Sequence, residues 1–583
     1  MNNDRIESEI DKIMGRLSLQ DKIGQCLTLN YLGWQITPFH RRFVNEFRCG
    51  GLRVTPHISA SNDTYHIRKM APHVSPAETT AALRELHEMA LERNGIPLHM
   101  ATDQEGDLSV DLVRGGLQLF PSNMGMAATG DPELVRKAFG VVARQVRAHG
   151  INMLHSPELD VNLNPNNPEI GMRAFSDDPN ACAQYGVEAM KAFMAEGVIP
   201  TAKHFPGRGD SEVDAHDQLD VLRVDRQRLE EVELFPYKAL IREGLPAIMT
   251  AHNAYTALDD ESVPASVSYK ITTGLLREEM GFDGVITTDA IGMAGVIHYA
   301  GGQWGATVMA IKAGADLVLI REDEATTAKC RDALLHAVKN KDISEKRIDQ
   351  SVRRILRMKM RAGLFESALP DPAATMEAIT RPENKTTCRR VFEKCSLIAR
   401  DRDGLVPLPR NARALVVEPY LPLYHDKGND ARYHAGMFFE NMSRYSPNLH
   451  LLETRCPATE DDMARFRKKL SQNETVVFFN AFWRGSGSNR PLIREAVKQG
   501  KTVIVATNDL YDAYCLPTAG TVICVFGAVP QATRIAADIV FGACQPEGKW
   551  PLIGVKKDDA VDPSAETDHA VSHYSKTIEK VAK

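Results

Sequence analysis

The first 360 residues alternate between short apolar, β-branched runs and longer amphipathic stretches. This alternation is typical of repeated β/α units that build a parallel sheet. The candidate strands are 25–30, 50–56, 98–104, 152–160, 201–205, 247–253, 284–290 and 315–320. Eight such units predict an α/β fold of the closed (β/α)8 barrel type, because eight parallel strands close on themselves with their helices outside.

A polar stretch containing Pro and Ala, residues 366–386, interrupts this pattern. It has no strong apolar period, which is typical of a domain linker. Beyond it, apolar runs alternate with helical stretches at 412–419, 473–480, 501–508 and 521–527. We therefore expect a barrel domain over 1–365, a linker over 366–386, and a smaller αβα sandwich with a C-terminal tail over 387–583.

The composition argues against several broad classes of function. The formal net charge of the 583 residues is −6, so no broad basic surface for nucleic acid or anionic membranes is expected. No apolar run approaches membrane-spanning length, and residues 1–17 are charged and amphipathic, unlike a signal peptide. The ten cysteines form no C-x-x-C pair, which favours reduced thiols. We expect a cytoplasmic protein without a metal or cofactor that binds a small ligand.

Polar side chains stand at the ends of several predicted strands, where a (β/α)8 barrel carries its active site. Asp103 ends the third strand, Lys203 and His204 the fifth, His252 the sixth and Asp289 the seventh. Each one alone fits a structural hydrogen bond about as well as a functional role. Four such strand ends on one rim indicate a ligand site.

Asp289 follows the apolar run 284–288, so its carboxylate is expected to project into the barrel mouth. A carboxylate there can attack the anomeric carbon of a glycoside as its oxocarbenium-like transition state forms. The alternative is that Asp289 caps the next helix.

Asp214 and His216 stand two residues apart in a Gly- and Asp-rich loop after the fifth strand. A carboxylate beside a histidine can fix its tautomer, and a histidine that titrates near neutrality can both give and take a proton. The spacing alone is equally compatible with a solvated loop.

These residues together resemble glycoside hydrolase family 3, specifically its bacterial β-N-acetylglucosaminidase branch. The matching stretches run in order through the predicted barrel: ATDQEG (101–106), LDVNLNPNNPEIGMRAFSDDP (159–179), AKHFPGRGDSEVDAH (202–216), IMTAHNAY (248–255), GFDGVITTDAIGM (281–293) and GADLVLI (314–320). The stretch SLIARDRDGLVPLP (396–409) looks like the start of that family's second, sandwich domain.

The resemblance implies a retaining exo-β-glycosidase with Asp289 as nucleophile, in a segment like the family's V-I-x-S/T-D. It implies His216 as acid/base, oriented by Asp214, as in the branch that carries K-H-F-P-G-H-G followed by D-S-H. The family positions that hold the nonreducing sugar correspond to Asp103, Arg173, Lys203 and His204.

The chain departs from the family pattern at several positions. Arg208 stands where the motif has a second His, and Ala215 replaces a Ser. Asp107 replaces the second Gly of D-Q-E-G-G, and the Arg that normally follows appears as Arg114, displaced by about three positions. We include Arg114 and Arg208 among the expected sugar-binding residues; Arg208 either favours an anionic substituent or braces the loop.

We therefore expect hydrolysis of terminal nonreducing β-linked N-acetylglucosamine in small carbohydrates, such as oligosaccharides or muropeptide fragments. The nearest alternatives keep the same chemistry but act on glucosides or xylosides, or use phosphate as the acceptor. More distant ones are a Schiff-base lyase using Lys203 and a barrel that binds sugar without turning it over. No nucleic acid or membrane partner is expected, and a homodimer is possible.

Overall fold

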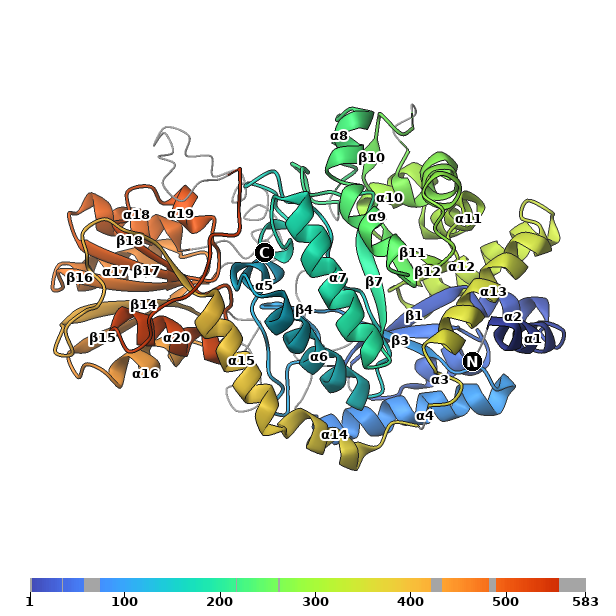
Figure 1. The fold of residues 1–583 in the computed structure, drawn as a ribbon, viewed down its shortest axis with the longest axis horizontal. Helices are drawn as coiled ribbons and strands as arrows, with labels where there is room; N and C mark the ends of the chain where they lie inside the picture. The colour runs from blue at the N-terminus through green and yellow to red at the C-terminus, as the bar shows by residue number, and fades with distance from the viewer. Residues whose placement is uncertain are drawn as a thin grey trace. The chain divides into compact units, whose positions relative to one another are not determined.

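The computed structural model describes residues 3–33, 35–56, 74–215, 218–259, 263–367, 369–420, 433–481 and 489–554. The chain forms two compact units (Figure 1). The barrel unit comprises Met1–Gln104, Phe139–Val161 and Cys182–Arg381, and the second unit comprises Glu105–Ala138, Asn162–Ala181 and Pro382–Lys583.

The barrel unit is built on a closed parallel sheet in the order β1-β12-β11-β9-β7-β6-β3-β2. Its strands are β1 (Leu27–Leu32), β2 (Gly51–Thr55), β3 (His99–Thr102), β6 (Met153–Leu154), β7 (Ile199–Phe205), β9 (Ala247–Thr250), β11 (Val285–Ala290) and β12 (Leu317–Ile320). Each predicted strand region overlaps one of them, so the predicted (β/α)8 barrel is confirmed. The strands are almost wholly buried, as parallel strands covered by helices must be.

Strand β6 is much shorter than the predicted strand over 152–160. Pro157 has no N–H to donate, so the ladder of hydrogen bonds between this segment and β7 is interrupted there. The chain pairs with β7 again at Glu158, which forms a parallel bridge with Lys203. This interruption places Glu158 and Asp160 beside the end of β7.

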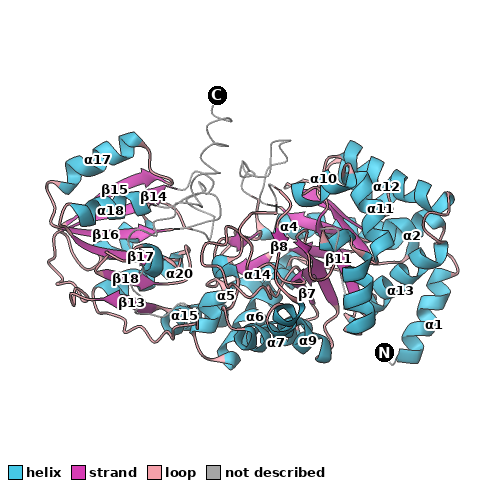
Figure 2. Ribbon diagram, turned by 90° about the horizontal axis from the view of Figure 1, so that it is seen from above, coloured by secondary structure: helices cyan, strands magenta, loops and turns pink. Residues whose placement is uncertain are grey.

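Helices surround the barrel strands (Figure 2). They are α1 (Asn3–Met14), α2 (Leu19–Gln25), α3 (Pro38–Asn45), α4 (Pro76–Asn94), α8 (Arg226–Glu231), α9 (Phe235–Arg242), η2 (Ala265–Val267), the π-helical η3 (Lys270–Glu279), α10 (Ala294–Ala300), α11 (Gln303–Ala313), α12 (Glu324–Lys339), α13 (Glu345–Arg361) and α14 (Pro372–Thr380). Two more, α6 (Pro132–Ala148) and α7 (Pro179–Ala195), begin in segments of the second unit and end in the barrel unit. A small parallel pair, β8 (Val221–Leu222) and β10 (Ala254–Tyr255), lies in the loops after β7 and β9.

The second unit carries a six-stranded sheet in the order β13-β18-β17-β16-β14-β15. Its strands are β13 (Leu397–Asp401), β14 (Ala414–Tyr420), β15 (Leu449–Arg455), β16 (Thr475–Asn480), β17 (Thr502–Thr507) and β18 (Thr521–Cys524). Only β13 runs antiparallel to its neighbour. The predicted α/β sandwich is confirmed, although β13 and β15 were not predicted as strands. Both lie at sheet edges, where half-exposed residues weaken the apolar pattern.

The sheet of the second unit is covered by helices, with α16 beside α20 and α17 beside α18 (Figure 1). The helices of this unit are η1 (Gly171–Arg173), α5 (Asn123–Ala128), α15 (Pro382–Cys395), α16 (Met437–Ser443), α17 (Glu460–Leu470), α18 (Arg490–Lys498), α19 (Asp512–Cys515) and α20 (Pro530–Val540). A two-stranded sheet pairs β4 (Gln104–Gly106) with β5 (Ser109–Val110).

The two units do not simply follow one another along the chain. Residues 105–138 and 162–181, which were expected in the barrel domain, group with the second sheet. Helices α14 and α15 occupy much of the stretch 366–386, expected as a linker. Asp371 caps α14, and Thr375 of that helix contacts Thr80 of α4. This stretch is therefore packed helix in its second half, and the chain passes from one unit to the other within it, at Arg381–Pro382.

Candidate active site

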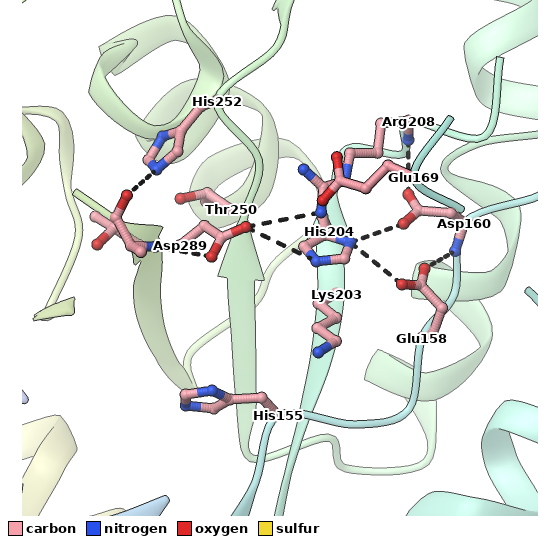
Figure 3. Close-up of polar contacts among 12 residues, drawn as sticks. His155, Glu158, Asp160, Glu169, Lys203, His204, Arg208, Thr250, His252 and Asp289 are labelled. Atoms are coloured by element: carbon pink, nitrogen blue, oxygen red, sulfur yellow. Dashed lines mark hydrogen bonds and ion pairs between the residues drawn. The ribbon is translucent and has the colours of Figure 1, made fainter. Parts of the chain in front are cut away.

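The carboxyl ends of the barrel strands gather several charged side chains (Figure 3). Asp103 follows β3, His155 follows β6, and Asp289 lies in β11. Lys203 and His204 belong to β7 and are joined by a cis peptide bond. The barrel closure thus brings together residues that are up to 186 positions apart in the chain. Asp103, Lys203, His204 and Asp289 were predicted at strand ends, whereas His155 was not singled out.

Asp289 has two differently placed carboxylate oxygens. Its Oδ1 accepts a hydrogen bond from the N–H of Ala290 at 2.7 Å. Its Oδ2 lies 3.8 Å from Nε2 of His204 and 3.8 Å from Nη2 of Arg208. The side chain is 16% exposed, so solvent reaches part of this carboxylate.

His252, predicted at a strand end of the rim, supports the backbone next to Asp289. Its Nε2 donates to the carbonyl of Ala290 at 3.0 Å, and its Nδ1 lies 2.7 Å from the hydroxyl of Ser266. Because a carbonyl can only accept, Nε2 carries the proton and Nδ1 accepts from Ser266. Buried His252 therefore has a structural contact at each ring nitrogen.

His204 is held by two buried carboxylates that the sequence did not single out. Its Nδ1 donates to Oδ2 of Asp160 at 2.8 Å and lies 3.3 Å from Oε2 of Glu158. These three side chains are close enough together to be considered as metal ligands. Since Nδ1 faces carboxylate oxygens at hydrogen-bond distance, it carries a proton and offers no lone pair to a metal. The contact instead fixes the ring with Nε2 toward Asp289.

Asp103 lies among positively charged groups. Arg53 and Lys203 both bind it, the latter at 2.9 Å, and Nδ1 of His155 lies 3.8 Å away. Burial alone would raise the pKa of Asp103, but the charges of Arg53 and Lys203 outweigh it and hold this pKa well below its usual range. The ionised carboxylate and the lysine supply an acceptor and a donor suited to sugar hydroxyls.

Arg53 was missed, although a signal for it exists. It is the charged residue within the otherwise apolar run of β2, and its side chain is 2% exposed. A cation inside a buried strand requires a nearby anion. That anion is Asp103, fifty residues later in the chain.

The loop after β7 is anchored at several points. The hydroxyl of Tyr255 donates to the carbonyl of Gly207 at 2.7 Å, and Asn253 binds Ser211 and Asp220 at 3.1 and 3.2 Å. Gly207 has a φ of 131°, and a Cβ there would lie 2.8 Å from Cβ of Glu233, so this close approach requires glycine.

Only one member of the predicted acid/base pair lies among the described residues of this loop. Asp214 is buried, whereas His216 lies outside the described residues. The pairing of Asp214 with His216 stays a prediction.

Arg173 and Arg114 belong to the second unit. Arg173 makes a two-pronged ion pair with Glu105, at 2.8 and 2.9 Å, and donates to the carbonyl of Glu169 at 3.2 Å. Arg114 is 1% exposed. Their roles in holding the sugar stay predictions.

Asp107, which departs from the family's glycine, is buried in the second unit. Its carboxylate accepts from the N–H of Ala528 at 2.6 Å and from the side chain of Asn508 at 2.8 Å. Its φ of 48° is in the left-handed region that glycine adopts without strain. Burial raises the pKa of this carboxyl to about 7. The Asp107 carboxylate thus makes two hydrogen bonds that a glycine at this position could not make.

Comparison with known proteins finds similarity to glycoside hydrolases. Residues 20–358 match the family described as "Glycosyl hydrolase family 3 N terminal domain". The chain is 32% identical to a beta-hexosaminidase A of Pseudoalteromonas piscicida over 346 residues, which span 55% of this chain and 56% of that protein. It is 27% identical over 521 residues to a beta-N-acetylglucosaminidase/beta-glucosidase of Cellulomonas fimi, with 84% of this chain and 87% of that one covered.

A solved structure has the same fold over nearly its whole length. It is a glycoside hydrolase family 3 beta-N-acetylglucosaminidase from Paenibacillus sp. str. FPU-7, with a TM-score of 0.82 and 30% sequence identity. The similarity covers 92% of this chain and 99% of that one. Among the described residues, no helix has both the length and the apolar character to cross a membrane.

Proposed function

The chain belongs to glycosyl hydrolase family 3, and we propose that it is a retaining exo-β-glycosidase that releases terminal β-linked N-acetylglucosamine. The observation that carries the proposal is the carboxylate of Asp289, at the carboxyl end of β11. One oxygen is anchored by the backbone, and the other lies between His204 and Arg208. This arrangement suits a nucleophile, because anchoring one oxygen of the carboxylate fixes the direction of the other.

In the first step Oδ2 of Asp289 attacks the anomeric carbon, the bond to the leaving oxygen breaks, and that oxygen takes a proton from His216. In the second step His216 removes a proton from water, the water oxygen bonds to the anomeric carbon, and Asp289 leaves as a carboxylate. Asp103 and Lys203 bind hydroxyls of the nonreducing sugar through their acceptor and donor atoms. Two successive inversions give net retention.

The N-acetylglucosamine preference is supported by the relatives named as hexosaminidases and N-acetylglucosaminidases. The Cellulomonas protein is named for both N-acetylglucosaminidase and β-glucosidase activity, so a panel of aryl β-glycosides decides between the sugars. We expect the N-acetylglucosaminide to react with a kcat/KM at least about tenfold above that of the glucoside and xyloside, a gap of roughly 1.4 kcal/mol. Turnover of the glucoside alone would contradict the sugar assignment and leave the reaction class intact.

Asp289 is tested by substitution and by trapping. Asp289→Asn should lower kcat/KM by about 1000-fold or more, because the amide is a poor nucleophile. Asp332→Asn, an exposed carboxylate on α12, is the matched control and should retain wild-type activity. A slow 5-fluoro glycoside should label Asp289 in the wild-type protein. Labelling of Lys203 by borohydride with a carbonyl substrate would instead support a lyase, and intact activity of Asp289→Asn would refute the proposal.

His216 is tested through its dependence on the leaving group. An activated aryl leaving group needs little acid assistance, so His216→Ala should lose the first step only with unactivated substrates. It should slow the second step with every substrate. Equal loss on all substrates in the first step would contradict its role as the acid.

Phosphate is a second candidate acceptor, favoured by one observation. The guanidinium of Arg208 lies beside the nucleophile, where it would attract an anion entering the second step. Reaction of an aryl N-acetylglucosaminide with and without phosphate separates the two outcomes. Formation of a sugar 1-phosphate supports phosphorolysis, and its absence leaves hydrolysis.

A further inference from the structure

Asp160 is a buried carboxylate at the carboxyl rim of the barrel, and the proposed reaction does not use it. It lies in the segment that returns to β7 after the interruption of β6, and it has no exposed surface. Its two oxygens have different partners. Oδ2 accepts from Nδ1 of His204 at 2.8 Å, and Oδ1 accepts from the backbone N–H of Arg208 at 2.6 Å (Figure 3).

Both partners of Asp160 reach the same atom of the nucleophile. Nε2 of His204 and Nη2 of Arg208 each lie 3.8 Å from Oδ2 of Asp289. One of these connections runs through an imidazole ring, and the other runs through the backbone and side chain of Arg208. Asp160 is therefore linked to the reactive oxygen by two independent routes, each through one intervening residue.

We propose that Asp160 is a positioning residue for the nucleophile, which holds His204 and Arg208 so that both face the reactive oxygen of Asp289. The inference rests on the proposed role of Asp289. Glu158 supports the arrangement because its Oε1 accepts from the N–H of Asp160 at 3.0 Å.

The physical effect of this arrangement differs between the two steps. In the first step Asp289 loses negative charge as its oxygen bonds to the anomeric carbon, so nearby positive charge gives little help. In the second step that bond breaks, and the electron pair returns to the carboxylate. The charged guanidinium of Arg208 stabilises this developing charge, and a carboxylate on Nδ1 of His204 stabilises its imidazolium in the same role. Loss of Asp160 should therefore slow the second step more than the first.

The first test is Asp160→Asn, with an activated aryl glycoside and stopped-flow detection of the released aglycone. The amide nitrogen cannot accept from either partner. We expect a roughly 10- to 100-fold fall in kcat, of the size seen when a supporting partner of a reactive group is removed. KM should fall as well, because the covalent intermediate accumulates, and a burst of aglycone should appear. Wild-type kcat and KM in a folded variant would overturn the proposal.

If Asp160→Asn does not fold, Arg208→Gln provides a second test. The backbone N–H of residue 208 can still donate to Asp160 in this variant, because that contact does not need the side chain. This variant should also slow the second step more than the first, and unchanged rates in both steps would overturn the proposal. If both variants fold, Asp160→Asn should slow the second step by a smaller factor in the Arg208→Gln background than in the wild type. Purely additive effects would mean that Asp160 only stabilises the fold.

The trapping experiment separates failure of this inference from failure of the proposed function. If the 5-fluoro glycoside labels Asp289 but Asp160→Asn retains wild-type rates, the positioning role alone is wrong. If Asp289 is not labelled and Asp289→Asn retains activity, the proposed function is wrong and the positioning role falls with it.

Discussion

Asp103 of the barrel unit and two carboxyl groups of the second unit, Asp107 and Glu418, have pKa values that are shifted in opposite directions. In the barrel unit Asp103, whose side chain is 30% exposed, is bound by Arg53 and Lys203, and their charges hold its pKa well below the usual range. In the second unit Asp107 and Glu418 are bound by neutral N–H and O–H donors, and burial raises the pKa of each to about 7. The partners explain the difference: cations lower the pKa of Asp103, whereas neutral donors leave burial to raise the pKa values of Asp107 and Glu418.

Several buried histidines of the barrel unit also have shifted pKa values. Burial lowers the pKa of four barrel-unit histidines to about 4 or, for His155, about 3. They are His40, His87, His149 and His155. These four histidines are therefore neutral in the folded protein near neutral pH.

The largest expected effect is an opposite dependence of stability on pH in the two units between about pH 5 and 7. Unfolding lets the buried histidines take up protons below their ordinary pKa near 6.5, so the barrel unit should become more stable as pH rises toward 6.5. Asp107 and Glu418 keep protons that the unfolded chain releases, so their contribution is fully present below pH 4 and is lost as pH rises through about 7. Over this pH range, each trend should change the free energy of unfolding by a few kcal/mol.

Hydrogen exchange resolved by peptide measures this contrast, because it reports the two units separately. Protection should rise with pH in peptides of the barrel strands and fall in those of the second sheet, after correction for the intrinsic exchange rate. Smaller upward pKa shifts at Asp220, Glu233 and Glu322 reduce the rise in the barrel unit. Parallel trends in both units would break the comparison.

The next largest effect is expected from Asp103→Asn. The substitution leaves Arg53 and Lys203, both at most 3% exposed, without the carboxylate that binds them. Removing one partner of a buried ion pair typically costs about 3 kcal/mol, so the free energy of unfolding should fall by about that amount. Urea denaturation checks it, with Asp332→Asn as the control. A loss below about 0.5 kcal/mol would mean that solvent already screens this cluster.

The corresponding Asp-to-Asn substitution in the second unit should raise the free energy of unfolding instead of lowering it. Asp107→Asn removes a carboxyl that must ionise in a buried site above pH 7, and an amide can both accept from Ala528 and bind Asn508. At pH 8 we expect a gain of about 1 kcal/mol, and at pH 5, where the carboxyl is protonated, little change. Denaturation at the two pH values tests the sign. Equal destabilisation at both would show that the carboxylate itself is needed to hold Ala528.

The smallest effect is expected from His155→Gln. The ring is neutral at every pH above its pKa of about 3, so it adds no charge to the Asp103 cluster in the working range. We expect kcat/KM to change less than about tenfold and the acid limb of the pH profile to stay in place. A shift of that limb by a pH unit would show that His155 is protonated during turnover.

The residues found and missed at the site have a common explanation. Asp289, Lys203 and His204 were predicted because they end apolar runs, which is a local signal. Glu158 and Asp160 lie in a stretch that reads as strand, and their role depends on the interruption at Pro157. His216 could be proposed only from the resemblance to a family, because the spacing of a loop does not determine where its side chains lie.

The sequence by itself determined the eight strands of the barrel, their place in the chain and the carboxylate at the end of β11, because apolar period and turn residues are properties of neighbouring positions. It also determined the family. Only the tertiary structure decided that Asp160 holds two groups beside Asp289, that Arg53 neutralises Asp103, and that residues 105–138 and 162–181 group with the second sheet. These contacts join segments far apart in the chain, and they form only when the strands close and the segments pack, so no local pattern encodes them.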